Sequence, residues 1–292
     1  MTTSPDLLAL INPLSGTLSL AQKEALRTYL LAQARALGFR PEALFTTHAG
    51  HATELAQTAL RQGIRRILAV GGDGTINETA RSLRHSNTAL GIVPLGSGNG
   101  LARHLGVPLD PHKAIDKALN GRPVVIDSGE IAGHPFFCTA GFGFEAYIAH
   151  EFAQQPTRGL TTYAQTAYRL FWSYKPKRYV VNGEEKSLFS LTFANAAQFG
   201  NNAWIAPRAN IADGELEQCE VIPFPRPAGV RLVWQLFNRT LDQSAYWHGT
   251  AVRSATVQGE APLLLHADGE PIRLATDTCR VTVLPGSLLV LL

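Results

Sequence analysis

The chain has 292 residues, of which 45% are hydrophobic and 17% charged, so it is long and apolar enough to bury the cores of two domains. Its formal net charge of +3 is small for this length and does not call for a nucleic-acid partner, although a local basic patch could still favour an anionic membrane surface. No apolar stretch approaches the roughly 20 residues that span a bilayer, and no basic leader or cleavage site is visible, so we expect a cytoplasmic protein.

The first 125 residues alternate short β-rich runs with helical patterns. Strands are expected at residues 7–12, 43–48, 65–70 and 89–95. Helices are expected at residues 20–37, 52–63, 76–84, 100–106 and 110–121. A repeated strand-then-helix order predicts an α/β domain at residues 1–125, with a parallel sheet covered by helices on both faces.

The pattern changes after Arg122. Residues 123–143 indicate paired strands, residues 143–153 and 161–175 look helical, and short strands dominate from Lys177 onward, with Asn182-Gly183 as a hairpin signal. We therefore predict a second domain at residues 126–292 that is mainly antiparallel β and resembles a β-sandwich.

One helix is expected to interrupt the strands of the second domain, within residues 224–241. Pro227 suits its first turn, where the missing N–H costs nothing. Its spacing gathers four apolar side chains on one face: Val230, Val233, Trp234 and Phe237.

The sequence GGDGT at Gly71 to Thr75 ends one of the predicted buried strands. Its glycines (Gly71, Gly72 and Gly74) relax the backbone, Asp73 can orient a loop or act near a metal, and Thr75 and Asn77 stand where a helix starts. The spacing matches neither a P-loop nor a dinucleotide-binding fingerprint. A tight Asp-Gly turn that caps a helix is the plain structural alternative.

A second glycine-rich turn, GSGNG at Gly96 to Gly100, follows the next predicted strand. Ser97 and Asn99 can bond to phosphate or ribose, and Arg103 lies about one helical turn onward, where a guanidinium can pair with phosphate. By itself this segment would be an ordinary βα turn. Two such turns at one edge of a parallel sheet suit nucleotide phosphates, which predicts a phosphoryl-transfer enzyme.

GGDGTINE followed by PLGSGNGLARHLG resembles the catalytic-domain family of diacylglycerol kinases, sphingosine kinases and bacterial lipid kinases. Further segments fit the same family in the same order: INPLSG at residues 11–16, FTTH at 45–48, PRANIADGELE at 207–217 and HADGEP at 266–271. The resemblance runs over nearly the whole chain and implies the two-domain fold of the NAD kinase and diacylglycerol kinase group.

The resemblance implies phosphorylation of a lipid hydroxyl that depends on ATP and Mg²⁺, with ATP on the α/β domain and the lipid beside the β-rich domain. The residues that it places at the nucleotide are Asn12, Pro13, Ser15, Gly16, Thr46, Gly71, Gly72, Asp73, Gly74, Thr75, Asn77, Glu78, Gly96, Ser97, Gly98, Asn99 and Arg103. Thr46 would lie on the adenine side.

The expected catalytic carboxylates are Glu270, Asp268 and Asp73. Glu270 is the first choice for the base that accepts the proton of the lipid hydroxyl, and Asp268 is the close alternative, because two positions apart in an extended segment they could share a face. A solvated β-turn is the plain alternative for the sequence DGE.

The family's magnesium-linked loop corresponds to residues 207–217. Asp213, with groups near Asn210 and Glu215, is expected to hold Mg²⁺ through oxygen and water, as this hard ion prefers. Asp127 either joins the same acidic network or terminates a strand.

The second turn departs from the pattern of many bacterial diacylglycerol kinases. They carry an acidic residue after the Asn of this turn, whereas this chain has Gly100, and Ser97 stands where threonine is frequent. The form GSGNG is closer to the sphingosine-kinase-like branch, so the resemblance implies the reaction but does not specify the acceptor lipid.

Three other features carry weaker signals. His48 and His51 lie near a helix start without a third ligand in metal spacing, which favours capping or exposure. The aromatic and basic residues of 161–179 fit either a membrane interface or a helix packed on its own domain. Three cysteines far apart (Cys138, Cys219 and Cys279) indicate a reducing compartment.

Two other functions remain as alternatives. An NAD kinase shares the GGDGT turn, although GSGNG and HADGEP argue against it, and a nucleotide-binding regulatory protein could keep the ATP site without turnover.

As partners we expect a lipid substrate at a membrane surface, bound transiently and peripherally, and no nucleic acid. A homodimer is one option for the assembly.

Overall fold

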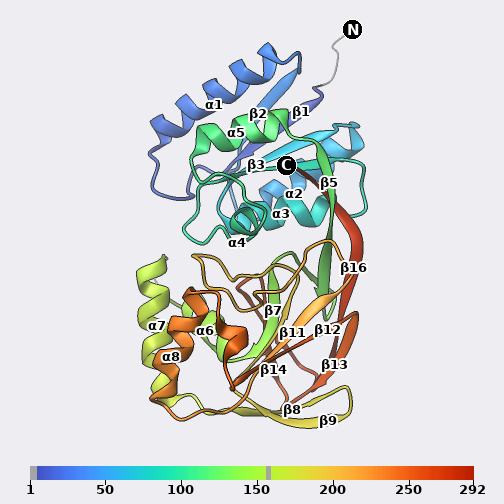
Figure 1. The fold of residues 1–292 in the computed structure, drawn as a ribbon. Helices are drawn as coiled ribbons and strands as arrows, with labels where there is room; N and C mark the ends of the chain where they lie inside the picture. Colours follow the sequence, from blue (N-terminus) through green and yellow to red (C-terminus); the bar gives the residue numbers. More distant parts are fainter. Residues whose placement is uncertain (1–4, 156–158) are drawn as a thin grey trace. The chain divides into compact units, whose positions relative to one another are not determined.

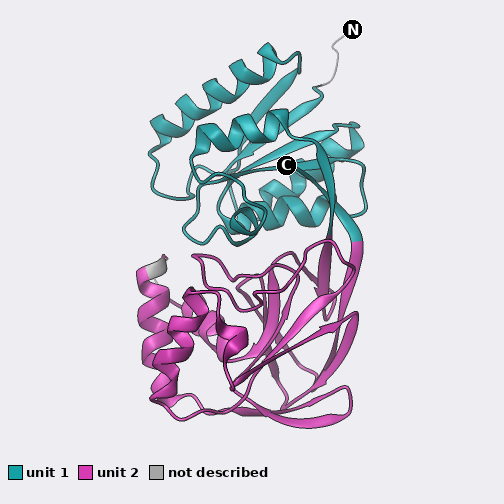
Figure 2. Ribbon diagram, viewed as in Figure 1, with its two compact units in different colours: residues 1–126, 286–292 teal, residues 127–285 magenta. Residues whose placement is uncertain are grey.

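The computed structural model describes residues 5–155 and 159–292. The chain forms two compact units, one made of residues 1–126 with 286–292 and the other of residues 127–285 (Figure 2). Strands β5 (Pro123–Ile131) and β16 (Thr278–Leu291) each contribute residues to both units. The sequence carries no pattern that marks the return of the last seven residues to the first unit.

The first unit contains parallel strands in the order β2-β1-β3-β4 (Figure 1). Their bounds are Leu7–Ile11 for β1, Pro41–Phe45 for β2, Arg66–Gly71 for β3 and Ala89–Pro94 for β4. The end of β16 adds a further parallel strand beside β4, where Leu289 pairs with Ala89. Strands β1 and β4 are buried along their whole length, which is typical of a parallel sheet covered on both faces and confirms the predicted α/β class.

The helices of the first unit follow its strands. They are α1 (Leu20–Ala36), α2 (His51–Arg61), α3 (Asp73–Leu83), α4 (Gly100–His104) and α5 (Pro111–Asn120). Local sequence explains two of the starts, because Ser19 and Gln22 form a capping box at α1, and the side chain of Asp110 accepts from the Lys113 N–H at α5.

The second unit contains a six-stranded antiparallel sheet in the order β12-β11-β10-β7-β14-β15. These strands are β7 (Thr139–Gly143), β10 (Ser190–Ala194), β11 (Leu216–Val221), β12 (Trp247–Val252), β14 (Leu263–Ala267) and β15 (Glu270–Leu274). The remaining strands are β6 (His134–Phe136), β8 (Lys177–Val181), β9 (Glu184–Leu188) and β13 (Ser254–Gln258), which belong to the same sheet as β16.

A hydrophobic core joins the two sheets within the second unit. Phe142 and Leu265 from the six-stranded sheet share one buried cluster with Val181, Val257 and Val281 from the other sheet. This arrangement confirms the β-sandwich-like second half. The predicted hairpin is also present, since β8 and β9 are joined by Asn182 and Gly183 with positive φ angles of 52° and 89°.

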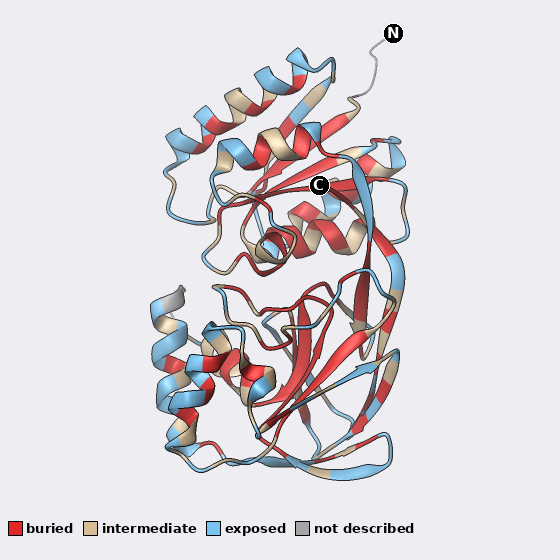
Figure 3. Ribbon diagram, viewed as in Figure 1, coloured by how far each residue is buried: buried red, intermediate tan, exposed pale blue. Residues whose placement is uncertain are grey.

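Helices cover the other face of the six-stranded sheet. They are α6 (Phe144–Ala153), α7 (Leu160–Ser173) and α8 (Ala228–Phe237), with the 3₁₀ turn η1 (Leu241–Gln243) after α8. Beneath them lies an aromatic cluster that includes Tyr174, Phe189 and Trp247, with Phe144 and Phe171 packed against it. The burial map shows much of the outer side of α7 and α8 as exposed (Figure 3).

Among the described helices, none is both long enough and apolar enough to cross a bilayer.

Candidate functional site

Four turns of the first unit follow adjacent parallel strands at the same edge of the sheet. The backbone connects them in series, because Thr46 N donates to Ile11 O at 2.8 Å, Asn12 N to Val70 O at 2.9 Å and Leu95 N to Gly71 O at 2.7 Å. The segments that begin at Thr46, Asn12, Gly72 and Leu95 are therefore neighbours at the carboxyl ends of β2, β1, β3 and β4. In open α/β sheets this edge is where ligands bind.

The glycines of these turns allow backbones to approach closely. A Cβ atom on Gly96 would lie only 2.8 Å from the Cα atom of Gly72, and one on Gly16 would lie 1.9 Å from the carbonyl oxygen of Leu95. Gly16 also has a φ of 65°, which other residues rarely adopt. The turns at residues 12–16, 71–75 and 95–100 consequently form one packed group of backbone.

Asp73 connects the two glycine-rich turns through its carboxylate. Its Oδ2 accepts from the backbone N–H of Asn99 and its Oδ1 from the N–H of Gly100, both at 2.9 Å. Both oxygens thus accept amides at the start of α4, as expected if Asp73 orients this loop.

The turn at residues 12–16 is held by Asn12 and by a buried lysine. Asn12 donates to Thr75 Oγ1 at 3.0 Å and accepts from Leu14 N at 2.8 Å, so it connects this turn to α3. Lys23 is 1% exposed, and its Nζ donates to the carbonyl of Pro13 at 2.6 Å. Burial lowers the pKa of Lys23.

Lys23 was not among the residues predicted from the sequence. It shares the buried stripe of α1 with Leu26, Leu30 and Ala34, at spacings that place all four on one face. A lone lysine in an otherwise apolar helical stripe was the signal that could have identified it.

The remaining predicted nucleotide residues lie around the same turns. Glu78 Oε1 accepts from Gly50 N at 3.0 Å, so this carboxylate is engaged at the start of α2. Arg103 Nε donates to the Gly98 carbonyl at 3.0 Å, and Ser97 is exposed. Thr46 is 7% exposed and Asn77 is also buried.

Asn99 carries an oxygen that has no protein partner. Its side-chain nitrogen donates to the Gly96 carbonyl at 2.7 Å, whereas its buried Oδ1 accepts no hydrogen bond within the described structure. A buried acceptor of this kind calls for a donor from water or a ligand.

In the second unit, Asp268 lies in the two-residue turn between β14 and β15. Its carboxylate accepts from the backbone N–H groups of Phe137 and Cys138 at 2.8 Å and of Thr139 at 3.0 Å. Asp268 and Gly269 have φ angles of 49° and 80°, so the expectation that Asp268 and Glu270 stand in one extended segment is wrong. The Asp-Gly pair forms the turn instead, because these residue types adopt positive φ most readily.

Glu270 differs from Asp268 in its surroundings. It is exposed and begins β15, where it pairs with Ala267 across the hairpin. Asp268 accepts backbone amides at the start of β7, whereas Glu270 is exposed at the start of β15.

The predicted magnesium loop is organised by two of its own side chains and by Asp127. Asn210 Oδ1 accepts from Ala212 N and Asp213 Oδ1 from Glu215 N, both at 3.1 Å. Asp127 is 3% exposed, lies inside β5 rather than at a strand end, and its Oδ2 accepts from Gly214 N at 2.7 Å.

A pocket of about 200 Å³ opens beside this loop. Its lining includes Asn210, Asp213 and Glu215. Arg208 and Glu217 also line it, and neither was predicted from the sequence. Arg208 lies 3.3 Å from Glu217 Oε1, while the buried Glu217 Oε2 has no partner within the described structure. Burial raises the pKa of Glu217, and the Arg208 charge opposes this shift.

The oxygen donors of this pocket fit a hard divalent cation. Mg²⁺ prefers carboxylate oxygens and water, and the unpaired Glu217 oxygen is an acceptor that a cation could satisfy. Glu217 lies in β11, two residues after Glu215, which directly precedes that strand, and both line the pocket. This alternate spacing was the available signal.

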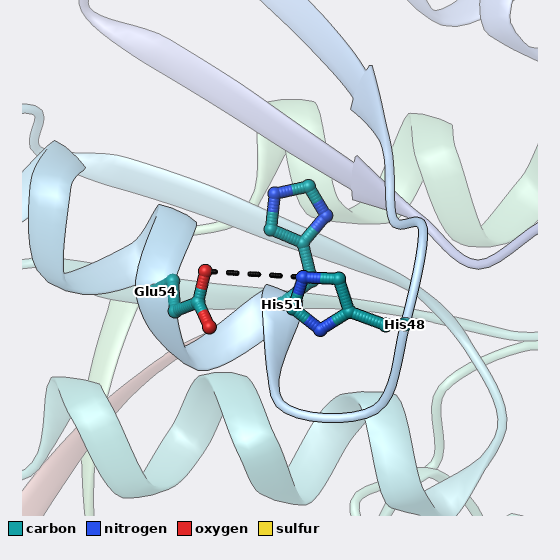
Figure 4. A group of neighbouring side chains, drawn as sticks. All are labelled: His48, His51 and Glu54. Atoms are coloured by element: carbon teal, nitrogen blue, oxygen red, sulfur yellow. Dashed lines mark ion pairs between the residues drawn. The ribbon is translucent and has the colours of Figure 1, made fainter.

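His48, His51 and Glu54 gather at the start of α2, with ligand atoms within 4.8 Å of one another (Figure 4). Glu54 is a third side chain that spacing did not reveal, and its Oε2 lies 4.0 Å from His48 Nε2. However, Thr47 N donates to His51 Nδ1 at 3.1 Å, so the proton of a neutral His51 ring is on Nε2 and neither nitrogen offers a free lone pair. The arrangement therefore favours capping of the turn before α2 over a metal site.

Comparison with known proteins connects both halves of the chain to lipid kinases. Residues 6–131 match the diacylglycerol kinase catalytic domain, and residues 139–292 match the YegS C-terminal NAD kinase beta sandwich-like domain. The chain belongs to the YegS-like and diacylglycerol kinase family of lipid kinases.

Individual relatives agree with this membership. The chain is 31% identical over 253 residues to the "Probable lipid kinase YegS-like" of Chromohalobacter salexigens, covering 83% of this chain and 81% of that protein. It is 30% identical over 252 residues to the "Diacylglycerol kinase" of Bacillus subtilis, covering 80% of each. A crystal structure described as a diacylglycerol kinase from Bacillus anthracis shares the fold, with a TM-score of 0.74 at 20% identity over 99% of this chain and 98% of that chain.

Proposed function

We propose that this lipid kinase transfers the γ-phosphate of ATP, with Mg²⁺, to a hydroxyl of a membrane lipid such as a diacylglycerol or a sphingoid-type alcohol. The observation that carries the proposal is the group of packed turns in the first unit, in which Asp73 joins the amides of Asn99 and Gly100 to the end of β3. Turns of this composition bring backbone N–H groups close to one another, as binding of a polyphosphate requires.

The nucleotide would contact the turns through backbone more than through side chains. The carboxylates of Asp73 and Glu78 already accept backbone amides, so their role would be to hold the turns in shape. A Cβ on Gly74 would meet no atom within 4 Å, which leaves open space beside this turn for a phosphate. The orphaned Oδ1 of Asn99 would accept a hydroxyl or amino group of the ligand.

Glu270 would act as the general base. It accepts the proton of the lipid hydroxyl, the hydroxyl oxygen forms a bond to the γ-phosphorus, and the bond from that phosphorus to the β,γ-bridging oxygen breaks to release ADP. Asp268 would position the segment before β7 through its hydrogen bonds to Phe137 and Cys138.

Asn210, Asp213 and Glu215 would hold Mg²⁺ through oxygen atoms and water, with Glu217 completing the acidic lining. A bound Mg²⁺ supplies positive charge that neutralises phosphate oxygens. Arg208 keeps the pocket from carrying the full charge of its carboxylates when no ion is bound.

The test is phosphorylation of a broad lipid extract with labelled ATP and Mg²⁺, read by mass spectrometry. We expect one lipid class to gain a phosphate in wild type and the product to be lost in Glu270→Gln, while ATP binding survives. A soluble assay with NAD as acceptor distinguishes the NAD kinase alternative. Folded wild-type protein that binds ATP yet phosphorylates no lipid and no NAD would contradict the proposal and favour a regulatory nucleotide-binding protein.

A further inference from the structure

An apolar surface is exposed on the two outer helices of the second unit. We call it the α7–α8 surface, and it consists of Tyr168 and Trp172 on α7 with Val230, Val233, Trp234 and Phe237 on α8. Trp172 is 57% exposed, Trp234 is 61% and Val230 is 78%. Large contiguous apolar patches on a protein surface mark interaction sites.

Helix α8 exposes apolar side chains, whereas a helix that only covers its own domain would bury them. Its inward side carries Gly229, Leu232 and a glutamine, Gln235, which is 4% exposed. The four apolar residues at i, i+3, i+4 and i+7 from Val230 face outward instead. The single apolar face that the sequence predicted for this helix is therefore the exposed face.

The two helices form one preformed surface. Arg226, just before α8, donates to the carbonyl oxygens of Phe171, of Trp172 at 3.2 Å and of Tyr174 at 2.7 Å, so it caps the end of α7. Its guanidinium lies 4.9 Å from the centre of the Phe171 ring, and a Cβ on Gly229 would lie 2.6 Å from that ring. Figure 1 shows α7 and α8 beside each other.

All charged side chains of α7 and α8 are positive. Arg169 on α7 and Arg231 on α8 are exposed, and neither helix contains an aspartate or glutamate. Lys175 follows α7 and is also exposed, while Glu151 on α6 lies 3.9 Å from Arg169. Tryptophan, tyrosine and arginine beside aliphatic side chains are the composition of a bilayer interface, and the positive charges complement anionic head groups.

We propose that the α7–α8 surface rests on the surface of an anionic bilayer, with Trp172 and Trp234 at the depth of the head groups and Arg231 toward lipid phosphate. The inference rests on the proposed function, because an enzyme that phosphorylates a membrane lipid must reach the bilayer. It adds a defined contact face on a part of the chain distinct from the turns and carboxylates assigned to chemistry.

The test measures cosedimentation with vesicles of phosphatidylcholine and phosphatidylserine, without ATP. Trp234→Glu and Phe237→Glu are expected to lower the partition coefficient by about tenfold or more, since each removes an aromatic side chain from the interface and adds a repelled charge. Leu37→Glu is the matched control, because Leu37 is 48% exposed and Phe237 50%, and it is expected to bind like wild type. Arg231→Glu is expected to weaken binding by about fivefold or more with anionic vesicles, and far less with phosphatidylcholine alone.

Two further measurements separate the outcomes. Activity on a short-chain acceptor in detergent should be unchanged in Trp234→Glu, whose folding is checked by its melting temperature. Vesicle binding equal to wild type in both glutamate variants, or an equal loss in Leu37→Glu, would overturn the proposal. A lower oligomeric mass without a change in vesicle binding would also overturn it and identify the surface as a contact between copies. If the variants lose binding but no lipid is ever phosphorylated, the membrane surface stands and the proposed function fails.

Discussion

The Asp73 carboxylate lies 2.9 Å from the backbone nitrogen of Asn99, and this hydrogen bond joins two turns that are 26 residues apart in the chain. A second bond to Gly100 uses the other carboxylate oxygen. An aspartate in this position holds the two glycine-rich turns at a fixed distance from each other, which any site built from their main-chain donors requires.

Asp73→Asn should therefore loosen the turns. The amide keeps one acceptor, but its NH₂ group would face a backbone N–H, so we expect a loss of about 2–3 kcal/mol in the free energy of unfolding and weaker ATP binding. Urea unfolding and ATP titration measure both. Asp116→Asn is the control, since Asp116 accepts from the Tyr29 hydroxyl at 2.8 Å and an amide oxygen can replace that contact. Equal stability of the two variants would contradict the assigned role.

Alanine substitutions of Gly96 and Gly74 distinguish a glycine that is needed for backbone packing from one that leaves space for a ligand. Gly96→Ala places a Cβ 2.8 Å from Gly72 Cα and should destabilise the first unit by roughly 1–3 kcal/mol. Gly74→Ala meets no atom within 4 Å and lies in α3, so stability should hold or rise by up to about 1 kcal/mol. Its ATP dissociation constant should nevertheless increase, because the methyl group fills the space proposed for phosphate. Unchanged ATP affinity in Gly74→Ala would argue against a nucleotide at this turn.

Substitution of Glu270 should lower activity, whereas substitution of Asp268 should lower stability. Glu270→Gln removes an exposed group, so the melting temperature should stay within error while kcat falls by about 10²–10⁴. Asp268→Asn disturbs three backbone hydrogen bonds and should cost about 2–3 kcal/mol of stability. Calorimetry and steady-state kinetics on both variants test the assignment, and the reverse pattern would make Asp268 the base.

The buried imidazole of His266 predicts a pH-dependent stability. Burial lowers the pKa of His266 from 6.5 to about 4. Between these values the unfolded chain binds a proton that the folded chain does not, so stability is complete above pH 6.5 and declines as the pH falls toward 4. Between pH 7.5 and pH 5, protonation of this residue in the unfolded chain should lower the free energy of unfolding by about 2 kcal/mol. His266→Gln should remove that part of the slope in urea unfolding, and an unaltered slope would show that other groups dominate.

Much of the fold could be predicted because its signals are local. The alternation of apolar runs with helical patterns identified the parallel sheet, and Asn182-Gly183 identified a hairpin from its turn chemistry alone. The glycines at 71–75 and 96–100 indicated turns at the ends of strands. They are neighbours because β3 and β4 are adjacent in the sheet.

Other features depend on partners that are distant in the chain. The oxygens of Asp268 are occupied by amides about 130 residues earlier, so spacing alone could not rank it below Glu270. The sequence DGE had two interpretations, an extended segment and a β-turn, and the turn is the one that the structure contains. Lys23 and Glu217 each had a weak local signal, but the sequence does not show that their charged groups are buried. The outward direction of the apolar stripe of α8 depends on which side packs against Phe171.

The return of residues 286–292 to the first unit affects how the protein can be divided. A gene cut after codon 126 would encode the parallel sheet without the end of β16. The backbone of β4 would then be unpaired at Ala89 and Leu90. Such an open edge promotes intermolecular pairing, so the shortened product should precipitate. A soluble version would need the terminal heptapeptide fused back through a designed loop.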